Sequence, residues 1–298
     1  MVMRFDRLSR DVAAAANVLL IVLIAVLMIS ASTVVIMLFQ GGQSEASSSK
    51  FVTVGQTIKV DYIGKLTDGR IFDTSNYTIA INDAQYPKTL SFTLRSVTSY
   101  APLSFTVGSG EMISGFDNAV VGMTVGETKT VTLSPEEAYG SMDPSKLVTF
   151  NLVETAPLIK TLTASAFTSV YGVHPVSGMT VTDPHFGWPA TVLEYSVTAD
   201  RVTVKNVPTL DAEYRIYGNS TVGWDIIVIN MDSSTNLITL EHQLTNADSD
   251  MIKGLDGTKT FFINQVDVAN GTAVRNYNGE LLGKSLVFII TLVAIVDE

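Results

Sequence analysis

Residue types that carry covalent or metal chemistry are scarce in this sequence of 298 residues. It has no cysteine, which excludes a thiolate nucleophile, a disulfide framework and a cysteine-ligated metal. The three histidines, His174, His185 and His242, match no common zinc spacing. Glu136 and Glu137 belong to a Ser-Pro-Glu-Glu pattern, which is typical of a capped helix start rather than of a carboxylate pair across a cleft. We therefore expect neither a metal ion nor any other cofactor.

The elements that must position the remaining side chains are short strands and one short helix. The strand patterns cover residues 57–63, 105–107, 129–133 and 285–296. A Thr-Asp-Gly-Arg turn at residues 67–70 follows the first of them. The helix is predicted over Ser114–Val121, with Ser114 as its N-cap and Gly122 at its end.

A long segment of different texture separates these elements, from Gly140 to about Ala273. It is rich in Thr and Val and predicts strands without a strong helix. Two similar strand–turn–strand units begin at Gly187-Trp188 and Gly223-Trp224. Two units are too few for a solenoid, so we interpret them as paired hairpins within one small β domain. Both tryptophans are expected to be buried anchors rather than partner-facing residues.

An apolar run without any charged residue extends from Val12 to Phe39. It is long enough to cross a bilayer as a helix. Arg4, Arg7 and Arg10 precede it and Glu45 is the first charge after it, which predicts a cytoplasmic N-terminus and an extracytoplasmic body. A cleaved signal peptide is the alternative, favoured by the small residues 30–32, but the apolar run continues past them.

Two further features of the composition concern the linker and the partners. Residues 40–50 are rich in Gly and Ser and predict a flexible linker between a membrane helix and the body. The formal net charge is −10, and such an acidic balance disfavours a nucleic-acid partner.

Three blocks of the sequence resemble the FK506-binding-protein (FKBP) family of peptidyl-prolyl cis-trans isomerases. They are GQTIKVDYIGKLTDGRIFDTS (Gly55–Ser75), PLSFTVGSGEMISGFDNAVVGMTVGETKTVTLSPEEAYG (Pro102–Gly140) and LLGKSLVFIITLVAI (Leu281–Ile295). The resemblance implies an α+β fold, in which a half-open antiparallel sheet of five or six strands wraps round one short helix. Long archaeal-type members of the family, which carry a chaperone-like insertion, are the most similar.

This resemblance also implies the domain organisation. Residues 1–50 would form the membrane anchor and linker, residues 51–140 with 274–298 the isomerase domain, and residues 141–273 an inserted, chaperone-like β domain. A second expansion, Thr78–Ala101, lengthens the loop after Asp73.

The family pattern further implies a pocket for proline, lined by nine residues. The walls and the polar group expected to act in catalysis are Tyr62, Phe72, Asp73, Tyr139 and Phe288; the residues expected to bind substrate are Leu103, Met112, Ile113 and Phe116. Phe116 would be the floor, where many relatives have Trp. Asp73 would polarise the site by hydrogen bonding a tyrosine or the substrate, and the N–H of Ile113 would meet a substrate carbonyl.

Each of these residues also has a structural interpretation. Phe72 and Phe288 fit a strand core, Asp73 fits a turn cap, and Met112-Ile113 fit packing beside a helix. Only their joint pattern favours a site.

Two functions follow from the sequence. The first is a membrane-anchored isomerase and folding helper outside the cytoplasm, whose partners are the bilayer and unfolded or proline-containing polypeptides. The second is a non-catalytic binding or structural subunit of a membrane complex, in which the FKBP-like body is a scaffold.

Overall fold

The computed structural model describes residues 50–219 and 221–296. The expected membrane helix, Val12–Phe39, and all of the expected linker except Lys50 lie outside these residues. Within the described part of the chain, no helix is both long and apolar enough to span a membrane.

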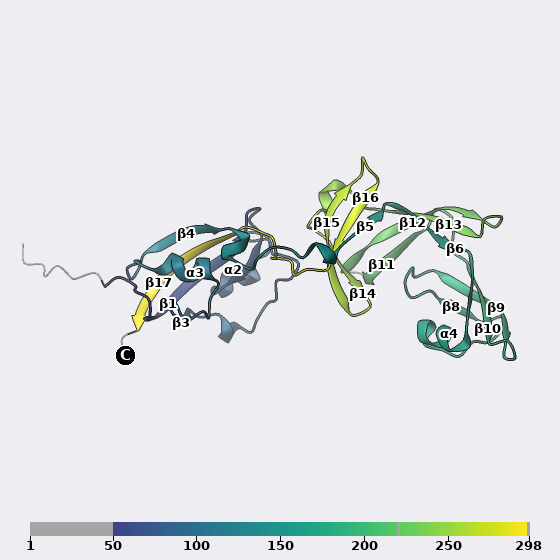
Figure 1. The fold of residues 1–298 in the computed structure, drawn as a ribbon, viewed down its shortest axis with the longest axis horizontal. Coiled ribbons are helices and arrows are strands. Elements are labelled where there is room, and N and C mark those ends of the chain that lie inside the picture. Colours follow the sequence, from purple (N-terminus) through teal and green to yellow (C-terminus); the bar gives the residue numbers. More distant parts are fainter. Residues whose placement is uncertain (1–49, 220, 297–298) are drawn as a thin grey trace, which may run out of the picture. The chain divides into compact units, whose positions relative to one another are not determined.

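The first sheet is antiparallel and is built from the two ends of the described chain (Figure 1). Its strands run in the order β2-β1-β17-β4, and β3 also pairs with β1. Their bounds are β1 Thr57–Leu66, β2 Ile71–Thr74, β3 Leu103–Thr106, β4 Thr128–Leu133 and β17 Leu286–Val296. The predicted turn joins β1 to β2, where Leu66 N–H donates to the Arg70 carbonyl at 2.9 Å and Gly69 has a φ of 95°.

Helix α3, Ser114–Val120, packs against β4 and β17 and completes one hydrophobic core with the sheet. The helix was predicted within one residue, but its cap was predicted wrongly. Ile113 is the N-cap and offers no side-chain acceptor, whereas Ser114 is already helical and its hydroxyl donates to the Glu137 carbonyl at 3.4 Å. The predicted capping box is confirmed in the 3₁₀ turn η2, Pro135–Glu137, where Ser134 N–H donates to Glu137 Oε2 at 2.9 Å.

The loop between β2 and β3 contains the short helix α2, Tyr77–Ile81, and the 3₁₀ turn η1, Val97–Ser99. Asn76 caps α2 by accepting from the Thr78 N–H at 2.8 Å.

Three further antiparallel sheets of four strands each lie between β4 and β17 in the sequence. The first has the order β14-β15-β16-β5: Lys253–Asp256, Lys259–Asp267, Thr272–Asn276 and Leu147–Asn151. The second has the order β11-β12-β13-β6: Glu213–Asn219, Val222–Asp232, Leu237–His242 and Val153–Pro157. The third has the order β7-β10-β9-β8: Ile159–Leu162, Arg201–Asn206, Pro189–Ser196 and Thr180–Thr182. We call residues 147–276, from β5 to β16, the insertion. The remaining 3₁₀ turns are η3, Pro144–Lys146, and η4, Asn246–Asp248.

Both predicted hairpins form, as β9–β10 and β12–β13. They lie in different sheets, and the β9–β10 strands pack with Phe167 in a core separate from that of the β12–β13 strands. Trp188 and Trp224 are buried in the larger core, 0% and 2% exposed, as expected of anchors.

This segment was predicted to contain no strong helix, and the structure has one short helix in it. Helix α4, Ala164–Tyr171, is capped by Thr163, whose hydroxyl accepts from the Ala166 N–H at 3.1 Å. Gly172 ends it in the left-handed conformation, with a φ of 72°. One buried residue, Phe167, holds the helix on its sheet, and a single apolar anchor leaves little periodicity in the sequence.

Within the larger core, Trp224 Nε1–H donates to His242 Nδ1 at 2.9 Å, and His242 Nε2 lies 3.3 Å from Glu154 Oε2. Because Nδ1 accepts from the indole, it is Nε2 that carries a proton and donates to the carboxylate. This hydrogen bond holds the pKa of Glu154 below its usual value of 4.5.

A pH dependence of stability follows from that depressed pKa. The folded protein binds fewer protons at Glu154 than the unfolded chain, so this stabilisation is present above pH 4.5 and is lost as the pH falls through the folded-state pKa. We expect Glu154→Gln to make the fall of the urea midpoint between pH 6 and 3 shallower. Glu213→Gln, which alters an exposed residue on β11, is the matched control. Parallel curves for Glu154→Gln and the unchanged protein would contradict the assignment.

Candidate active site

One cavity of about 400 Å³ opens on the first sheet. All nine residues predicted for the pocket line it, together with two that were not predicted, Arg95 and Glu111. The lining side chains come from β1, β2, β3, β17, helix α3 and the segments that flank them. This volume falls in the range of small-ligand sites and suits a short polypeptide segment.

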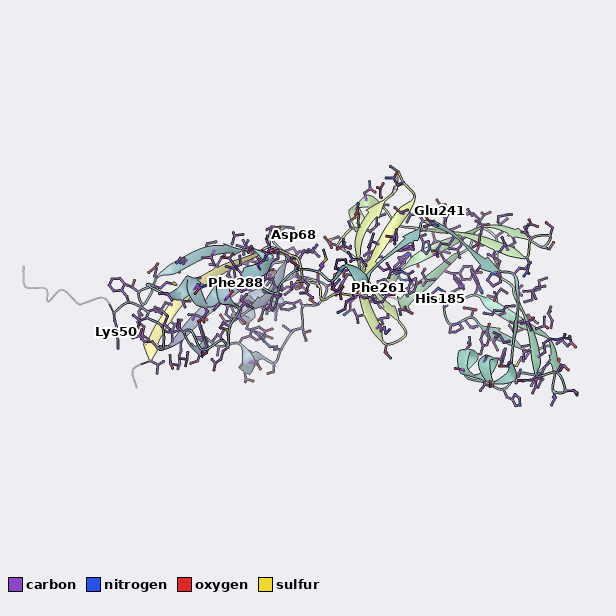
Figure 2. The ribbon with its side chains drawn as sticks, viewed as in Figure 1. Lys50, Asp68, His185, Glu241, Phe261 and Phe288 are labelled. Carbon is purple, nitrogen blue, oxygen red and sulfur yellow. The ribbon has the colours of Figure 1, made fainter. Side chains whose placement is uncertain are left out.

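Phe116, on α3, is the floor of the cavity and is buried. Its ring centroid lies 5.0 Å from that of Phe288 and 6.0 Å from that of Tyr62, both in edge-to-face geometry. Phe72 packs edge-on against Phe288, with centroids 5.4 Å apart. Such perpendicular contacts fix ring orientation, so the apolar walls are rigid. Phe288, which Figure 2 labels on β17, therefore belongs both to the core and to the cavity wall.

A glycine on β1 makes room for two of these rings. Gly64 lies opposite Phe288 on one side and opposite Asp73 on the other. A Cβ atom at Gly64 would come within 2.6 Å of the Phe72 ring and 3.1 Å of the Phe288 ring.

Gly64→Ala is therefore expected to push Phe72 from its position in the wall. Overpacking of this kind costs about 1–3 kcal/mol of unfolding free energy, and we expect kcat/KM for an X–Pro peptide to fall about fivefold to tenfold. Urea unfolding and a peptide isomerisation assay measure the two effects. Ser104→Ala, which alters an exposed residue on the neighbouring strand β3, is the control. Unchanged turnover and stability in Gly64→Ala would show that the wall tolerates displacement.

The polar side of the cavity is a chain of three side chains. The Tyr62 hydroxyl donates to Asp73 Oδ2 at 2.7 Å, as predicted for a neighbouring tyrosine. Asp73 Oδ1 lies 3.2 Å from the Arg95 guanidinium, which also donates to the Thr74 carbonyl at 2.8 Å. Burial raises the pKa of Tyr62, and the Asp73 carboxylate raises it further, so the hydroxyl remains a donor at neutral pH. Asp73 Oδ1 also accepts from the Thr74 N–H at 2.8 Å, a contact between neighbouring residues of β2.

Met112, Ile113 and Tyr139 form a further part of the lining, which we call the rim. Among the described residues, no acceptor for the Ile113 N–H is found, so this donor is available beside the cavity. Tyr139 is 48% exposed, and burial of its hydroxyl together with the Asp73 charge raises its pKa. The rim thus offers hydrogen-bond donors above apolar walls.

Two lining residues were missed by sequence reasoning. Arg95 lies in the expanded loop Thr78–Ala101, where no pattern marks one basic residue over another. Glu111 immediately precedes Met112 inside the second block, so its adjacency to two predicted residues was a usable signal. Across residues 50–219 and 221–296, no cluster of His, Cys, Asp or Glu could hold a metal ion.

Comparisons with known proteins agree with this geometry. A model of the FKBP-type peptidyl-prolyl cis-trans isomerases matches residues 48–159. The short-type peptidyl-prolyl cis-trans isomerase of Methanocaldococcus jannaschii is 38% identical over 151 residues, which are 50% of this chain and 79% of that protein. The chain belongs to the FKBP family.

FK506-binding protein 2 of Yarrowia lipolytica is 32% identical to this FKBP over 32% of the chain, and the match spans about half, 51%, of that relative. The crystal structure of AtFKBP13 aligns at 29% identity over 32% of this chain and 63% of that one, with a TM-score of 0.22. The family assignment makes the protein an FKBP-type peptidyl-prolyl cis-trans isomerase, and its substrates are proline-containing polypeptides.

Proposed function

We propose that the cavity lined by Tyr62, Phe116 and Phe288 binds the proline of an X–Pro segment and lowers the barrier to rotation about the preceding amide. That barrier is about 18–20 kcal/mol because resonance gives the C–N bond partial double-bond character. No bond is broken, so neither a nucleophile nor a metal is required. Catalysis needs only a site that binds the twisted amide more tightly than the planar one.

The lining residues suit this task. A twisted amide loses resonance and much of its charge separation, so apolar walls formed by Phe72, Phe116 and Phe288 bind it at a lower desolvation cost than the planar amide. The Ile113 N–H can donate to a substrate carbonyl and hold the peptide while its amide rotates. Asp73, through Tyr62, orients the polar edge of the site. The convergence of all nine predicted residues on one cavity is the single observation that carries this proposal.

We further propose that the protein is anchored in a membrane and assists folding on the extracytoplasmic side. Arginines precede the apolar run Val12–Phe39, and the first charged residue after it is the acidic Glu45. This difference in charge supports the proposed orientation. The insertion, with its exposed apolar residues such as Val176 and Leu193, would hold unfolded clients near the pocket and raise the local concentration of their prolines.

A variant without residues 1–48 tests the isomerase site directly. We expect it to accelerate cis-trans exchange in an X–Pro peptide and the proline-limited refolding of a model protein. A folded variant that accelerates neither reaction would favour the non-catalytic scaffold instead.

Removal of the insertion separates capture from catalysis. The chain leaves and re-enters the first sheet side by side: Tyr277 N–H donates to the Lys146 carbonyl at 2.9 Å, and Asn278 Nδ2 to the Asp143 carbonyl at 3.0 Å. A short Gly-Ser link can therefore replace residues 147–276. Peptide turnover should persist and refolding assistance should fall. An equal loss in both assays would argue against a separate client-holding role.

Protease treatment of membrane vesicles tests the location. With the full chain in right-side-out vesicles, added protease should digest the body, and in inverted vesicles the body should be protected. Digestion only in inverted vesicles would overturn the proposed orientation.

A further inference from the structure

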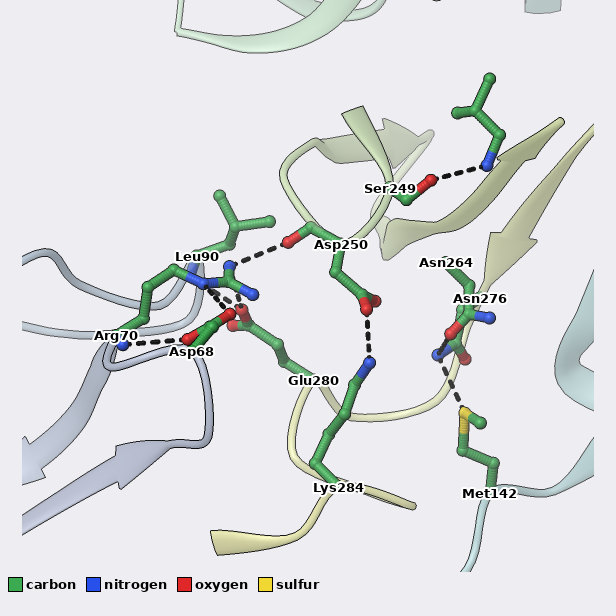
Figure 3. Close-up of polar contacts among 11 residues, drawn as sticks. Asp68, Arg70, Leu90, Met142, Ser249, Asp250, Asn264, Asn276, Glu280 and Lys284 are labelled. Carbon is green, nitrogen blue, oxygen red and sulfur yellow. Dashed lines mark hydrogen bonds and ion pairs between the residues drawn. The ribbon is translucent and has the colours of Figure 1, made fainter. Parts of the chain in front are cut away.

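The expanded loop between β2 and β3 pairs with β2, where the Ile71 N–H donates to the Pro87 carbonyl at 2.7 Å and the Thr89 N–H donates to the Ile71 carbonyl at 3.0 Å. Two further points of contact follow close by in the sequence. The first is at Leu90 and Ser91, and the second is at Arg95, which reaches the active-site cavity. Figure 3 shows the first point, where the Glu280 side chain meets Leu90 and Arg70. Glu280 comes from the segment that returns from the insertion to β17.

Glu280 is placed to hold the loop backbone. Its Oε1 accepts from the Leu90 N–H at 3.0 Å and its Oε2 from the Ser91 N–H at 2.6 Å. The carboxylate is 6% exposed, and the Arg70 guanidinium lies 3.7 Å from it as the compensating charge. A buried carboxylate that accepts two backbone N–H groups makes charge-assisted hydrogen bonds, which are about twice as strong as neutral ones.

At the second point, Arg95 pairs with Asp73 and donates to the Thr74 carbonyl. Its own N–H donates to the Tyr100 hydroxyl at 3.1 Å, and its guanidinium lies 4.9 Å from the centroid of the Tyr100 ring. The position of the guanidinium thus depends on the position of the loop backbone.

Little else fixes the chain between these points. Three residues separate Ser91 from Arg95, so their Cα atoms can be at most about 14 Å apart. Residues 93–99 are exposed, and the two hydrogen bonds made from Phe92 and Thr93 are local to the loop. The short connection therefore limits how far Arg95 can move independently of Ser91.

We propose that Glu280 is a positioning residue for the isomerase site and acts through Arg95. By holding Leu90 and Ser91, it sets the distance between the Arg95 guanidinium and the Asp73 carboxylate. Asp73 is the residue that accepts the hydrogen bond from Tyr62. The segment that follows the insertion thereby determines the polarity of the cavity. This inference rests on the proposed role of Asp73 in catalysis.

A double-mutant cycle in the full chain tests the inference. Glu280→Gln keeps the size of the side chain but replaces its charge and one acceptor. We expect it to lower kcat/KM for an X–Pro peptide about fivefold to tenfold, and Glu280→Asp, which is too short to reach both amides, to do the same. In the Arg95→Ala background the same Glu280 change should cost less than about twofold, because its target is gone.

Hydrogen exchange adds a readout that does not need turnover. Glu280→Gln should speed exchange across residues 92–100. Lys284→Met removes a nearby ion pair with Asp250, 2.6 Å long, without touching the loop, and should leave both exchange and kcat/KM unchanged. If the unaltered protein has no activity, the proposed function fails while exchange still reports whether Glu280 holds the loop.

The outcomes are distinct. The inference would be overturned if Glu280→Gln lowered kcat/KM equally in the unaltered and the Arg95→Ala backgrounds. Unchanged hydrogen exchange across residues 92–100 would also overturn it. The inference would be supported if Glu280→Gln lowered thermal stability by a similar amount in both backgrounds but lowered kcat/KM only in the protein that retains Arg95. Should Glu280→Gln fail to fold, Glu280→Asp provides the same comparison.

Discussion

Replacing Asp73 with alanine is expected to lower kcat/KM for an X–Pro peptide by about 10- to 100-fold while the protein stays folded. The Asp73 carboxylate accepts the Tyr62 hydroxyl at 2.7 Å and lies 3.2 Å from the Arg95 guanidinium. Without it, both groups lose the partner that orients them at the cavity. Stability should change little, because the Asp73–Arg95 pair is about two-fifths exposed on each side and such pairs contribute at most about 1 kcal/mol.

Two further variants separate the causes of that loss. Tyr62→Phe removes only the hydroxyl and keeps the ring, so it should reduce kcat/KM less than Asp73→Ala does. Asp83→Ala removes an exposed carboxylate from the same region, one that pairs with Lys88 and does not line the cavity, and should leave turnover unchanged. Full activity of a folded Asp73→Ala protein would show that the carboxylate has no part in catalysis.

Replacing Phe116 with alanine is expected to lower the unfolding free energy by about 3–5 kcal/mol. Phe116 is 3% exposed and contacts the rings of Tyr62, Phe105 and Phe288. Removing it leaves a void beside these three rings, which the surrounding core can fill only in part. Urea unfolding monitored by circular dichroism measures the change.

The size of the void should set the size of the effect. Phe116→Leu retains most of the apolar volume and should cost less than half as much as alanine. Val125→Ala, at a residue 58% exposed, should stay within about 0.5 kcal/mol of the unaltered protein. A loss below about 1 kcal/mol for Phe116→Ala would mean that the floor of the cavity contributes little to the core.

The isomerase body was largely predictable because its signals are local. The β1–β2 turn needs a Gly at positive φ, and the Ser134–Glu137 capping box is a four-residue pattern. The nine pocket residues were found through family resemblance rather than through periodicity, since Phe72 or Phe288 alone fits an ordinary strand core. Their shared cavity depends on strand pairings across more than 200 residues, such as Gly64 with Phe288, which no local pattern encodes.

The insertion was less predictable for a related reason. Strand patterns around Trp188 and Trp224 predicted each hairpin, because a hairpin pairs neighbours in sequence. The sheet that each hairpin joins is decided by more distant strands: β7 for the first and β6 for the second. Arg95 was missed on similar grounds, because a single basic residue in an irregular loop gains its role only from the partners that the fold brings to it.

The position of β17 has a consequence for synthesis. This strand lies between β1 and β4 in the sheet, yet the ribosome makes it only after the whole insertion. Until then β1 lacks its longest partner, and Phe288, a wall of the cavity, does not exist. An emerging chain therefore has an incomplete cavity, and the unpaired edge of β1 can pair with strands of other unfinished molecules. The cavity is complete only when β17 has paired with β1 and β4.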